Sequence, residues 1–327
     1  MMITENSKKT VEHNGREYIM PNHIQIETVG GKGMCNARCD MCTINDWQKP
    51  PRIMKNPEFE KFVDDLIPFK EHFDYITLHC NGEPLMDKHL HEKVRYLKDN
   101  GFRGTGFATN GSMLTEKRSI ELIEAGLDTI IVSLDGITKE THEKIRKGLN
   151  YEKIVKNVLS FIDFRNKYAL NNEKVTRIII RFIMQPLNKH EWDDYQVFWK
   201  KNINKNLNDE ILYFPIHNWG GQLDAKERMR QTYGDGRKIF YCEDMHERMI
   251  IFSDGNVSHC DADYNGFYPH GNVFKNHFLD IYNNSIFNKY RKYMSEGKIL
   301  ELTHCTTCTI PLGREDKGSV ELVTESS

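Results

Sequence analysis

Between residues 23 and 217 the chain alternates strand-like segments with helix-like segments. The strand candidates are rich in β-branched and aromatic residues and span 24–29, 75–80, 104–109, 129–134, 177–184 and 210–216. Amphipathic stretches lie between them, at 57–73, 87–99, 116–125, 151–170 and 191–203. This alternation predicts an α/β fold with a parallel sheet and helical connections. A doubly wound sheet and a curved, partly closed barrel both fit the pattern.

Polar and glycine-rich stretches follow most of these strand candidates. "HCNGEP" follows the second strand, "TNGS" the third, "SLDG" the fourth and "HNWGG" the sixth. Parallel α/β folds place their sites at the C-terminal ends of the strands. The sequence therefore predicts a site at that edge of the sheet.

The first strand candidate leads into a loop with three cysteines. Cys35, Cys39 and Cys42 form the spacing C-x3-C-x2-C, and no fourth cysteine or histidine lies close by in sequence. Thiolates bind soft and borderline metals, and cysteines are the usual ligands of iron–sulfur clusters. Three cysteines would hold three irons of a cubane cluster and leave the fourth iron open. A partial zinc site and buried structural cysteines are the alternatives.

This loop and its position resemble the radical S-adenosylmethionine (SAM) superfamily. In that family a C-x3-C-x2-C loop follows the first strand of a partial barrel, and the resemblance covers residues 23–217. It implies a partial (β/α)6 TIM-type barrel and a 4Fe–4S cluster whose open iron binds SAM. Met41 departs from the family, because the residue before the last cysteine is often aromatic there. A polarizable methionine side chain still packs beside adenine.

The resemblance also implies which residues bind SAM. Gly82, Glu83 and Pro84 stand where the family's Gly-Gly-Glu-type motif receives the methionine amino group, although "GEP" alone is also a simple turn. Further candidates, for the carboxylate and the ribose, are Thr109, Asn110, Ser133, Arg146 and Arg181. Strand-end capping and surface salt bridges are the competing interpretations of these residues.

The implied chemistry is radical chemistry. One electron from the reduced cluster cleaves SAM, and the resulting 5′-deoxyadenosyl radical abstracts a hydrogen atom from the substrate. The cofactors carry this reaction, while the protein supplies geometry and excludes water. A flavodoxin- or ferredoxin-type protein is the expected electron donor.

Beyond residue 218 the regular alternation stops. Residues 248–260 predict a hairpin that turns at Asp254-Gly255, and residues 277–297 predict a helix. Four cysteines belong to this region: Cys242, Cys260, Cys305 and Cys308. Taken alone they fit a structural zinc site. With "DGNVSHC", "GNV" and "LDIYNN" they resemble the SPASM/twitch extension, which implies one auxiliary 4Fe–4S cluster with every iron ligated.

The predicted domain organisation has three regions. Residues 1–22 are an N-terminal extension, and residues 23–217 are the radical SAM barrel. Residues 218–327 are a small hairpin-plus-helix iron–sulfur domain that ends in a polar tail.

A fully ligated auxiliary cluster can accept an electron from a substrate radical. That suits the dehydrogenation of an alcohol, so the chain resembles the aminocyclitol dehydrogenases of the superfamily, acting on a carbohydrate-like or aminocyclitol substrate. Cys80 is the only cysteine outside both sets, and it favours an alternative reaction. A thiol there could return a hydrogen atom to a substrate radical, as in carbohydrate epimerases. A buried structural cysteine is the competing interpretation.

Two further alternatives concern the substrate and the presence of catalysis. A peptide or protein maturase is one, although only about twenty residues precede the first strand, too few for the leader-peptide domain usual in such relatives. A non-catalytic metal-binding protein is the other.

Several residues are candidates for substrate contacts and proton transfer. His217, Asn218 and Trp219 combine an aromatic plane with hydrogen-bonding side chains, which suits a sugar or cyclitol ring. Trp219 also fits as packing between the barrel and the extension. The candidate proton acceptors are Asp261, Asp263 and His79, with solvated loop residues as the competing interpretation.

Composition excludes two classes of partner. The 327 residues contain 45 Lys and Arg against 47 Asp and Glu, a formal net charge of −2, so no basic field recommends nucleic acid or an anionic membrane. No apolar run is long enough to span a bilayer, and the polar start of the chain lacks the apolar core of a signal peptide. We expect a cytoplasmic protein whose eight cysteines serve metals or catalysis rather than disulfides.

Overall fold

The computed structural model describes residues 9–223, 242, 247–302, 305, 308 and 318–319. Residues 1–8 and most of the predicted polar tail lie outside this part of the chain. Within the described residues, every helix is too short or too polar to cross a lipid bilayer.

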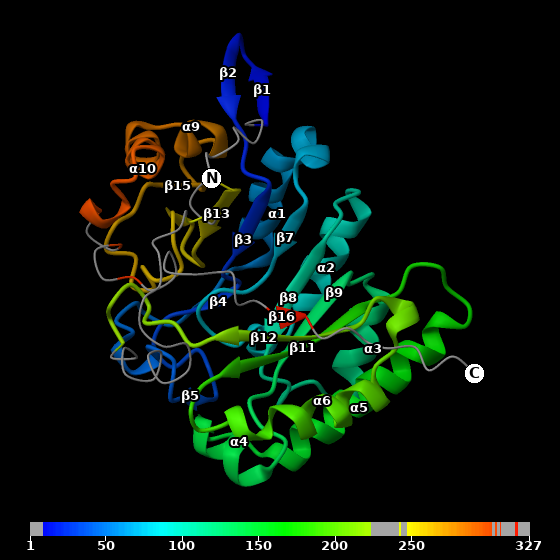
Figure 1. Ribbon diagram of the computed structural model, residues 1–327. Coiled ribbons are helices and arrows are strands. Elements are labelled where there is room, and N and C mark those ends of the chain that lie inside the picture. The colour runs from blue at the N-terminus through cyan, green and yellow to red at the C-terminus, as the bar shows by residue number, and fades with distance from the viewer. Residues whose placement is uncertain are drawn as a thin grey trace.

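The predicted parallel sheet is confirmed. Its strands are β3 (His23–Ile26), β7 (Tyr75–Thr77), β8 (Thr105–Thr109), β9 (Thr129–Ser133), β11 (Arg177–Met184) and β12 (Glu210–Pro215). They are neighbours in chain order, and each adjacent pair is parallel (Figure 1). The fold is therefore the partial (β/α)6 barrel of the prediction, and the C-terminal ends of all six strands share one edge.

Five helices of the described chain match the predicted amphipathic stretches. They are α1 (Asn56–Leu66), α2 (Leu90–Asp99), α3 (Glu116–Glu124), α5 (Tyr151–Ala169) and α6 (Trp192–Asn202). The longest, α5, starts where the Asn150 side chain accepts a hydrogen bond from the Lys153 N–H, and it buries Ile154, Val158 and Phe161.

Three helical features differ from the prediction. The stretch 57–73 divides, because α1 gives way to the 3-10 helix η2 (Ile67–His72) around Pro68, which has no N–H to donate. The stretch 277–297 divides into α9 (Phe278–Tyr282) and α10 (Ser285–Ser295), since Asn284 caps the second helix. The short helix α4 (Lys139–Ile145) carries too few turns to reveal a period.

The C-terminal region continues the barrel sheet. The predicted hairpin is confirmed as β13 (Arg248–Ile251) and β14 (Asn256–Ser258), with Gly255 at φ +81° in the turn. Strand β13 pairs in parallel with β3, and β15 (Gly271–Asn272) follows β14 at the edge. Hydrophobic side chains of α9 join the main core on this side (Figure 1).

The N-terminal extension contains a β-hairpin that the sequence pattern does not predict. Strands β1 (Thr10–His13) and β2 (Arg16–Ile19) form it, and it projects at the top of Figure 1. The Tyr18 hydroxyl donates to Asp280 at 3.0 Å, and the backbone of Ile19 exchanges two hydrogen bonds with the Asn283 side chain. The extension therefore attaches to the α9 region.

Short elements complete the described fold. They are β4 (Val29–Gly30), β5 (Arg38–Cys39), β6 (Arg52–Ile53), β10 (Arg146–Lys147), β16 (Gly318–Ser319), η1 (Ile44–Asp46), η3 (Pro84–Met86), η4 (Lys189–Glu191), η5 (Lys205–Leu207) and η6 (Ile299–Glu301).

Candidate functional site

The three-cysteine loop leaves the barrel after β3 and is fastened to it by two small ladders. Strand β4 pairs with β6, so the two ends of the excursion are tied together. Strand β5 pairs with β10, which sets Cys39 opposite Arg146. The Arg146 guanidinium lies 3.7 Å from the Cys39 sulfur. The loop is thus held over the edge of the sheet where the prediction places the site.

The three thiols lie close enough to influence one another. Burial raises the pKa of Cys35 to about 12, and the neighbouring Cys39 adds to the rise. Burial also raises the pKa of Cys42 to about 12, with contributions from both other thiols. Within the described chain, no three His, Cys, Asp or Glu side chains have the spacing of ligands to a single metal ion. Each cysteine of a cubane cluster binds a different iron, so its ligands lie further apart than the ligands of a single metal ion. The three neighbouring thiols of this loop fit such a cluster.

The Gly82-Glu83-Pro84 turn lies directly against the cysteine loop. Gly82 has φ +122°, and a Cβ there would meet the Val29 carbonyl oxygen at 2.3 Å and the Met34 carbonyl oxygen at 2.9 Å. The Glu83 N–H donates to the Met34 carbonyl at 2.9 Å. Only glycine allows this approach of the two backbones. The two motifs, far apart in sequence, therefore form one wall.

The Glu83 carboxylate is fully buried and serves as an internal anchor. It accepts hydrogen bonds from the Thr109 hydroxyl at 2.6 Å, the Asn110 N–H at 2.9 Å and the Leu85 N–H at 3.1 Å. Burial raises its pKa, and these three donors oppose that rise. Glu83 thus joins the ends of β7 and β8, which are the strands that carry the predicted SAM-binding motifs.

Replacing Glu83 by glutamine tests this anchor. One carboxylate oxygen becomes an NH2 donor, which leaves a buried backbone or hydroxyl donor without an acceptor, at a cost of about 1–3 kcal/mol. We expect SAM binding to weaken by about tenfold, measured by equilibrium dialysis on the reconstituted protein. Glu92→Gln, on the exposed face of α2, is the matched control. An unchanged dissociation constant in Glu83→Gln would mean that the motif is a simple turn with no part in SAM binding.

A side-chain network that the sequence does not reveal ties the cysteine loop to β8. Asn110 donates to the Asn36 side-chain oxygen at 2.9 Å, and Asn36 donates to the Ser112 hydroxyl at 2.8 Å. Ser112 closes the ring by donating to the Asn110 oxygen at 2.6 Å. Thr109 and Asn110, predicted as direct SAM ligands, therefore already have protein partners in this wall.

The two predicted cationic ligands differ in burial, since Arg146 is buried and Arg181 is half-buried. Arg146 pairs with Asp135 at 2.8 Å, whereas Arg181 donates to the Ser133 hydroxyl at 2.6 Å and 3.1 Å. Burial lowers the pKa of Arg181 to about 10, and the positive Arg146 contributes to the shift. Among the described residues, Arg181 has no carboxylate partner at ion-pair distance. A half-buried guanidinium without a carboxylate partner fits the SAM carboxylate, so Arg181 and Ser133 are the better-placed candidates.

Two polar side-chain atoms that follow β7 are buried and have no hydrogen-bond partner among the described residues. They are His79 Nδ1 and the Asn81 side-chain oxygen. Such atoms are uncommon and indicate a water or a ligand in contact with them. Together with Arg181 they support a bound polar molecule in this part of the barrel.

His79 should make the protein sensitive to acid. Burial lowers its pKa to about 3 from the ordinary 6.5, and the charge of Arg181 adds to this. The unfolded chain takes up a proton that the folded imidazole refuses, so the free energy of unfolding should fall by about 1.4 kcal/mol per pH unit below the ordinary histidine pKa. Urea unfolding above and below that pH measures the loss. His79→Asn should remove the contribution of His79 and leave that of His142, whose pKa burial also lowers to about 3. The exposed His190→Asn should change neither contribution, so an equal loss in both variants would contradict the burial of His79.

The second cysteine set also comes together. Burial raises the pKa of Cys305 to about 12, with contributions from Cys308 and Cys242. The pKa of Cys260 lies well above its ordinary value through burial, and Asp261 and Cys242 add to the rise. The four thiols therefore share one neighbourhood, beside β14 and η6. Four soft donors in one place fit a cluster with every iron ligated.

The candidate proton acceptors differ in their surroundings. Asp261 lies 3.7 Å from Arg248, while the buried Asp263 accepts hydrogen bonds from the Phe267 and Tyr268 N–H groups and from the Ser258 hydroxyl. Asp263 therefore holds its own loop. Asp261 lies nearer the barrel, because Arg248 also donates to Gln25 on β3 at 2.8 Å.

Cys80 lies at the junction of the barrel and the C-terminal region. Burial raises its pKa well above the ordinary value, and the carboxylates of Glu27 and Asp261 add to the rise. The Asn81 amide lies 3.3 Å from its sulfur. The thiol is thus held in its protonated form.

Sequence analysis missed Glu27, a buried carboxylate at this junction. It pairs with Lys49 at 3.0 Å and accepts from the N–H and hydroxyl of Ser253 at 3.2 Å and 3.1 Å. These contacts link β3, the return of the cysteine loop and the β13–β14 turn. A charged residue directly after the apolar stretch of β3 is the signal that could have revealed it.

The aromatic residue after β12 lies against the cysteine loop. Trp219 donates its indole N–H to the Met41 carbonyl at 2.8 Å. It packs against the buried cluster of Ile44, Trp47 and Tyr264, which Cys35 and Cys42 also contact. The His217 ring centre lies 4.6 Å from that of Trp219. Asn218 is buried next to them. The Met41 side chain packs with the buried Ile145 and Ile216.

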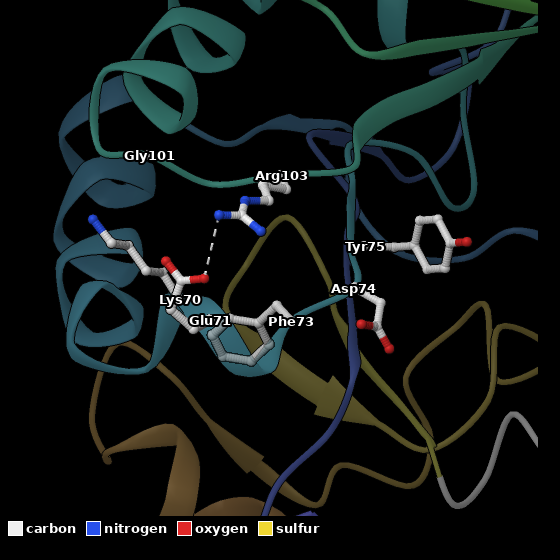
Figure 2. A pocket seen from close by; sticks show the side chains of 7 residues that line it. All are labelled: Lys70, Glu71, Phe73, Asp74, Tyr75, Gly101 and Arg103. Carbon is white, nitrogen blue, oxygen red and sulfur yellow. Dashed lines mark ion pairs between the residues drawn. The ribbon is translucent and has the colours of Figure 1, made fainter.

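A surface pocket of about 360 Å³ lies at the other end of the strands. Its lining residues are Lys70, Glu71, Phe73, Asp74, Tyr75, Gly101 and Arg103 (Figure 2). Tyr75 begins β7, whereas the predicted SAM-binding motifs follow the C-terminal ends of strands. This pocket is therefore separate from the candidate site.

Both cysteine sets lie within residues that match known protein families. Residues 33–173 match the model of the radical SAM superfamily, and residues 242–309 match the model of SPASM, an iron–sulfur cluster-binding domain. The first match contains the three-cysteine loop, and the second contains all four later cysteines.

Individual relatives and structures agree with this architecture. A tungsten-containing aldehyde ferredoxin oxidoreductase cofactor-modifying protein of Pyrococcus furiosus is 34% identical over 126 residues, 37% of this chain and 35% of its own length. Across the leading curated relatives the match spans 35% to 58% of their length. The structure of BtrN in complex with AdoMet and 2-DOIA aligns with TM-score 0.57 at 21% identity, over 88% of this chain and 93% of BtrN. Streptococcus suis SuiB bound to the precursor peptide SuiA aligns with TM-score 0.62 at 13% identity, over 90% and 71%.

Proposed function

The chain belongs to the radical SAM superfamily, and from this premise we propose that it is an oxidoreductase that dehydrogenates an alcohol of a carbohydrate-like or aminocyclitol substrate. Its radical SAM and SPASM domains take SAM and two 4Fe–4S clusters as cofactors. When bound, these cofactors supply one-electron reduction and hydrogen-atom abstraction. The non-catalytic alternative is set aside, because the chain is a radical SAM enzyme.

The chain's own residues hold and orient the cofactors. Cys35, Cys39 and Cys42 would ligate the first cluster, and the wall formed by the Gly82-Glu83-Pro84 turn would face SAM beside it. The paired Arg181 and Ser133 would bind the SAM carboxylate, because Arg181 is a half-buried cation within hydrogen-bond distance of the Ser133 hydroxyl. The indole of Trp219 closes the loop side and limits the access of water.

The convergence of the four later cysteines is the observation that carries the dehydrogenation proposal. Cys242 influences both Cys260 and Cys305, and Cys308 influences Cys305, so the four thiols can ligate one cluster completely. A cluster without an open iron has no position for a substrate and exchanges electrons only. Net removal of two electrons from an alcohol needs such an acceptor, with a nearby base for the proton. Asp261, adjacent to Cys260 and close to Arg248, is our candidate base.

Two observations support the substrate class. His217, Asn218 and Trp219 form an aromatic and polar corner beside the cysteine loop, which suits a hydroxylated ring. The fold also extends over 93% of BtrN, whose structure contains the small molecule 2-DOIA. SuiB, which was solved with a precursor peptide, keeps the peptide-maturase alternative open.

A turnover screen in heavy water tests the proposal. Reconstituted enzyme is incubated with SAM, a reductant and panels of sugars, aminocyclitols and peptides. We expect loss of two hydrogens from a cyclic alcohol, detected by mass spectrometry. Turnover of peptides alone would refute the carbohydrate assignment.

Epimerisation by Cys80 is the second candidate reaction. The high pKa of this buried thiol keeps its hydrogen in place, as a hydrogen-atom donor requires. In the same screen, epimerisation would incorporate one deuterium at carbon without change of oxidation state. Cys80→Ala should abolish that incorporation but leave dehydrogenation unaffected.

Location, electron donor and domain limits complete the proposal. We place the protein in the cytoplasm, because none of its eight cysteines forms a disulfide. A flavodoxin- or ferredoxin-type protein is the proposed electron donor. We keep the domain limits at 22/23 and 217/218.

A further inference from the structure

We propose that the outer face of the β5–β10 ladder is the docking surface for an acidic one-electron carrier protein. This inference rests on the proposed function, because it presumes that the first cluster accepts electrons from a protein donor. The surface consists of the exposed side chains of Arg38, Lys144 and Lys147, which we call the basic face.

The basic face has an arrangement that folding alone does not favour. The register of the ladder sets Lys147 directly opposite Arg38, and like charges at such positions are destabilising. Among the described residues, one carboxylate lies at ion-pair distance from them, since Asp40 is 3.7 Å from Lys147. Lys144 adds a third exposed cation from the end of α4. The whole chain has a formal net charge of −2, so this local excess of positive charge is not a general property of its surface.

The basic face lies directly outside the cluster ligands. The residue pair next to Lys147–Arg38 in the ladder is Arg146–Cys39, and Arg146 reaches within 3.7 Å of the Cys39 sulfur. Arg38 donates to the Cys35 carbonyl at 2.9 Å, so its guanidinium also lies against the loop. Electron transfer slows steeply with distance. A donor seated on this face would therefore lie close to a cluster held by Cys35 and Cys39.

Charge complementarity selects the occupant. Flavodoxins and ferredoxins carry acidic surfaces around their redox centres, and opposite charges speed encounter and fix orientation. In the step itself the anionic flavodoxin hydroquinone would give one electron to the cluster and become the neutral semiquinone, so no proton is released. No bond to this chain forms or breaks.

The test uses the reconstituted holoenzyme, a purified bacterial flavodoxin and the variants Lys147→Glu and Lys144→Glu/Lys147→Glu. Arg38 is left intact because it supports the cysteine loop. Binding of flavodoxin is measured by calorimetry at low and high salt. We expect the dissociation constant to rise by about tenfold in Lys147→Glu, further in the double variant, and less at high salt. Lys201→Glu, an equal charge change at the far end of α6, should bind as the wild type does.

Formation of 5′-deoxyadenosine with dithionite, a small reductant that needs no docking surface, separates the possible outcomes. Unchanged dithionite-driven formation with weakened flavodoxin binding supports the basic face. Unchanged flavodoxin binding in both variants would overturn it. An equal loss of 5′-deoxyadenosine formation with dithionite would also overturn it, because the cations would then stabilise the cluster itself and not bind the donor. If even the wild type forms no 5′-deoxyadenosine with dithionite, the proposed function fails, while the calorimetry still decides the docking surface.

Discussion

Replacement of Cys35, Cys39 and Cys42 together by alanine is expected to lower the iron content from about eight atoms per chain to about four and to abolish SAM cleavage. Each of these thiols should bind one iron of the first cluster, so their removal leaves no site for it. The mutual influence of the three thiols, and the ladders that hold their loop, make a shared cluster the simplest occupant. Iron, sulfide and zinc are measured after anaerobic reconstitution, with 5′-deoxyadenosine as the readout of SAM cleavage.

The control for this experiment is Cys80→Ala. It removes a cysteine that belongs to neither set, and its iron content should stay at about eight. Circular dichroism establishes that both variants are folded. A triple variant that kept all its iron would contradict the assignment of the loop as a cluster site.

The variant Cys305→Ala/Cys308→Ala should keep SAM cleavage and lose oxidation of the substrate. Iron is again expected to fall to about four per chain, but the remaining cluster should still cleave SAM with dithionite. With a substrate found by the screen, the oxidised product should disappear, because the substrate radical would lose its electron acceptor. Mass spectrometry of the product and quantification of 5′-deoxyadenosine from the same reaction measure the two effects separately.

Metal analysis also decides between a cluster and zinc at the second set. A wild-type protein with about four irons and one zinc would make this set a structural site. The double variant would then lose zinc instead of iron, and dehydrogenation would lack its acceptor. The epimerase assignment for Cys80 would gain support from that result.

The strands of the barrel and the cysteine loop could be predicted from the sequence because both depend on local signals. β-Branched runs such as 177–184 are buried on both faces in a parallel sheet, and the structure confirms that strand over the same residues. The approach of Cys242 to Cys305 could also be predicted, because the predicted hairpin and the helical segment after it lead the chain back toward Cys242.

Contacts between distant segments could not be predicted in this way. Neither the pairing of β13 with β3 nor the Asn36–Ser112–Asn110 ring leaves a periodic pattern, because each depends on which segments the fold brings together. The break at Asn284 was missed for another reason. The hydrophobic period continues through it, and only the capping contacts reveal where one helix ends and the next begins.

The roles of single polar residues depend on their partners. Thr109, Ser133 and Asp263 look alike as strand-end or loop residues in the sequence. In the structure Thr109 donates to Glu83, Ser133 accepts from Arg181, and Asp263 accepts from its own loop. Of these three contacts, only the one between Ser133 and Arg181 leaves a cation available for a ligand.

The parallel pairing of β13 with β3 has a consequence for how this protein can be divided. A fragment that ends before β13 would leave the buried, isoleucine-rich β3 as an open edge, with its backbone N–H and C=O groups unsatisfied. Such edges recruit strands from other molecules, so an isolated barrel would tend to aggregate. The two cofactor-binding regions are thus not interchangeable modules, and one cannot be exchanged for a homologous counterpart without rebuilding the strand beside it.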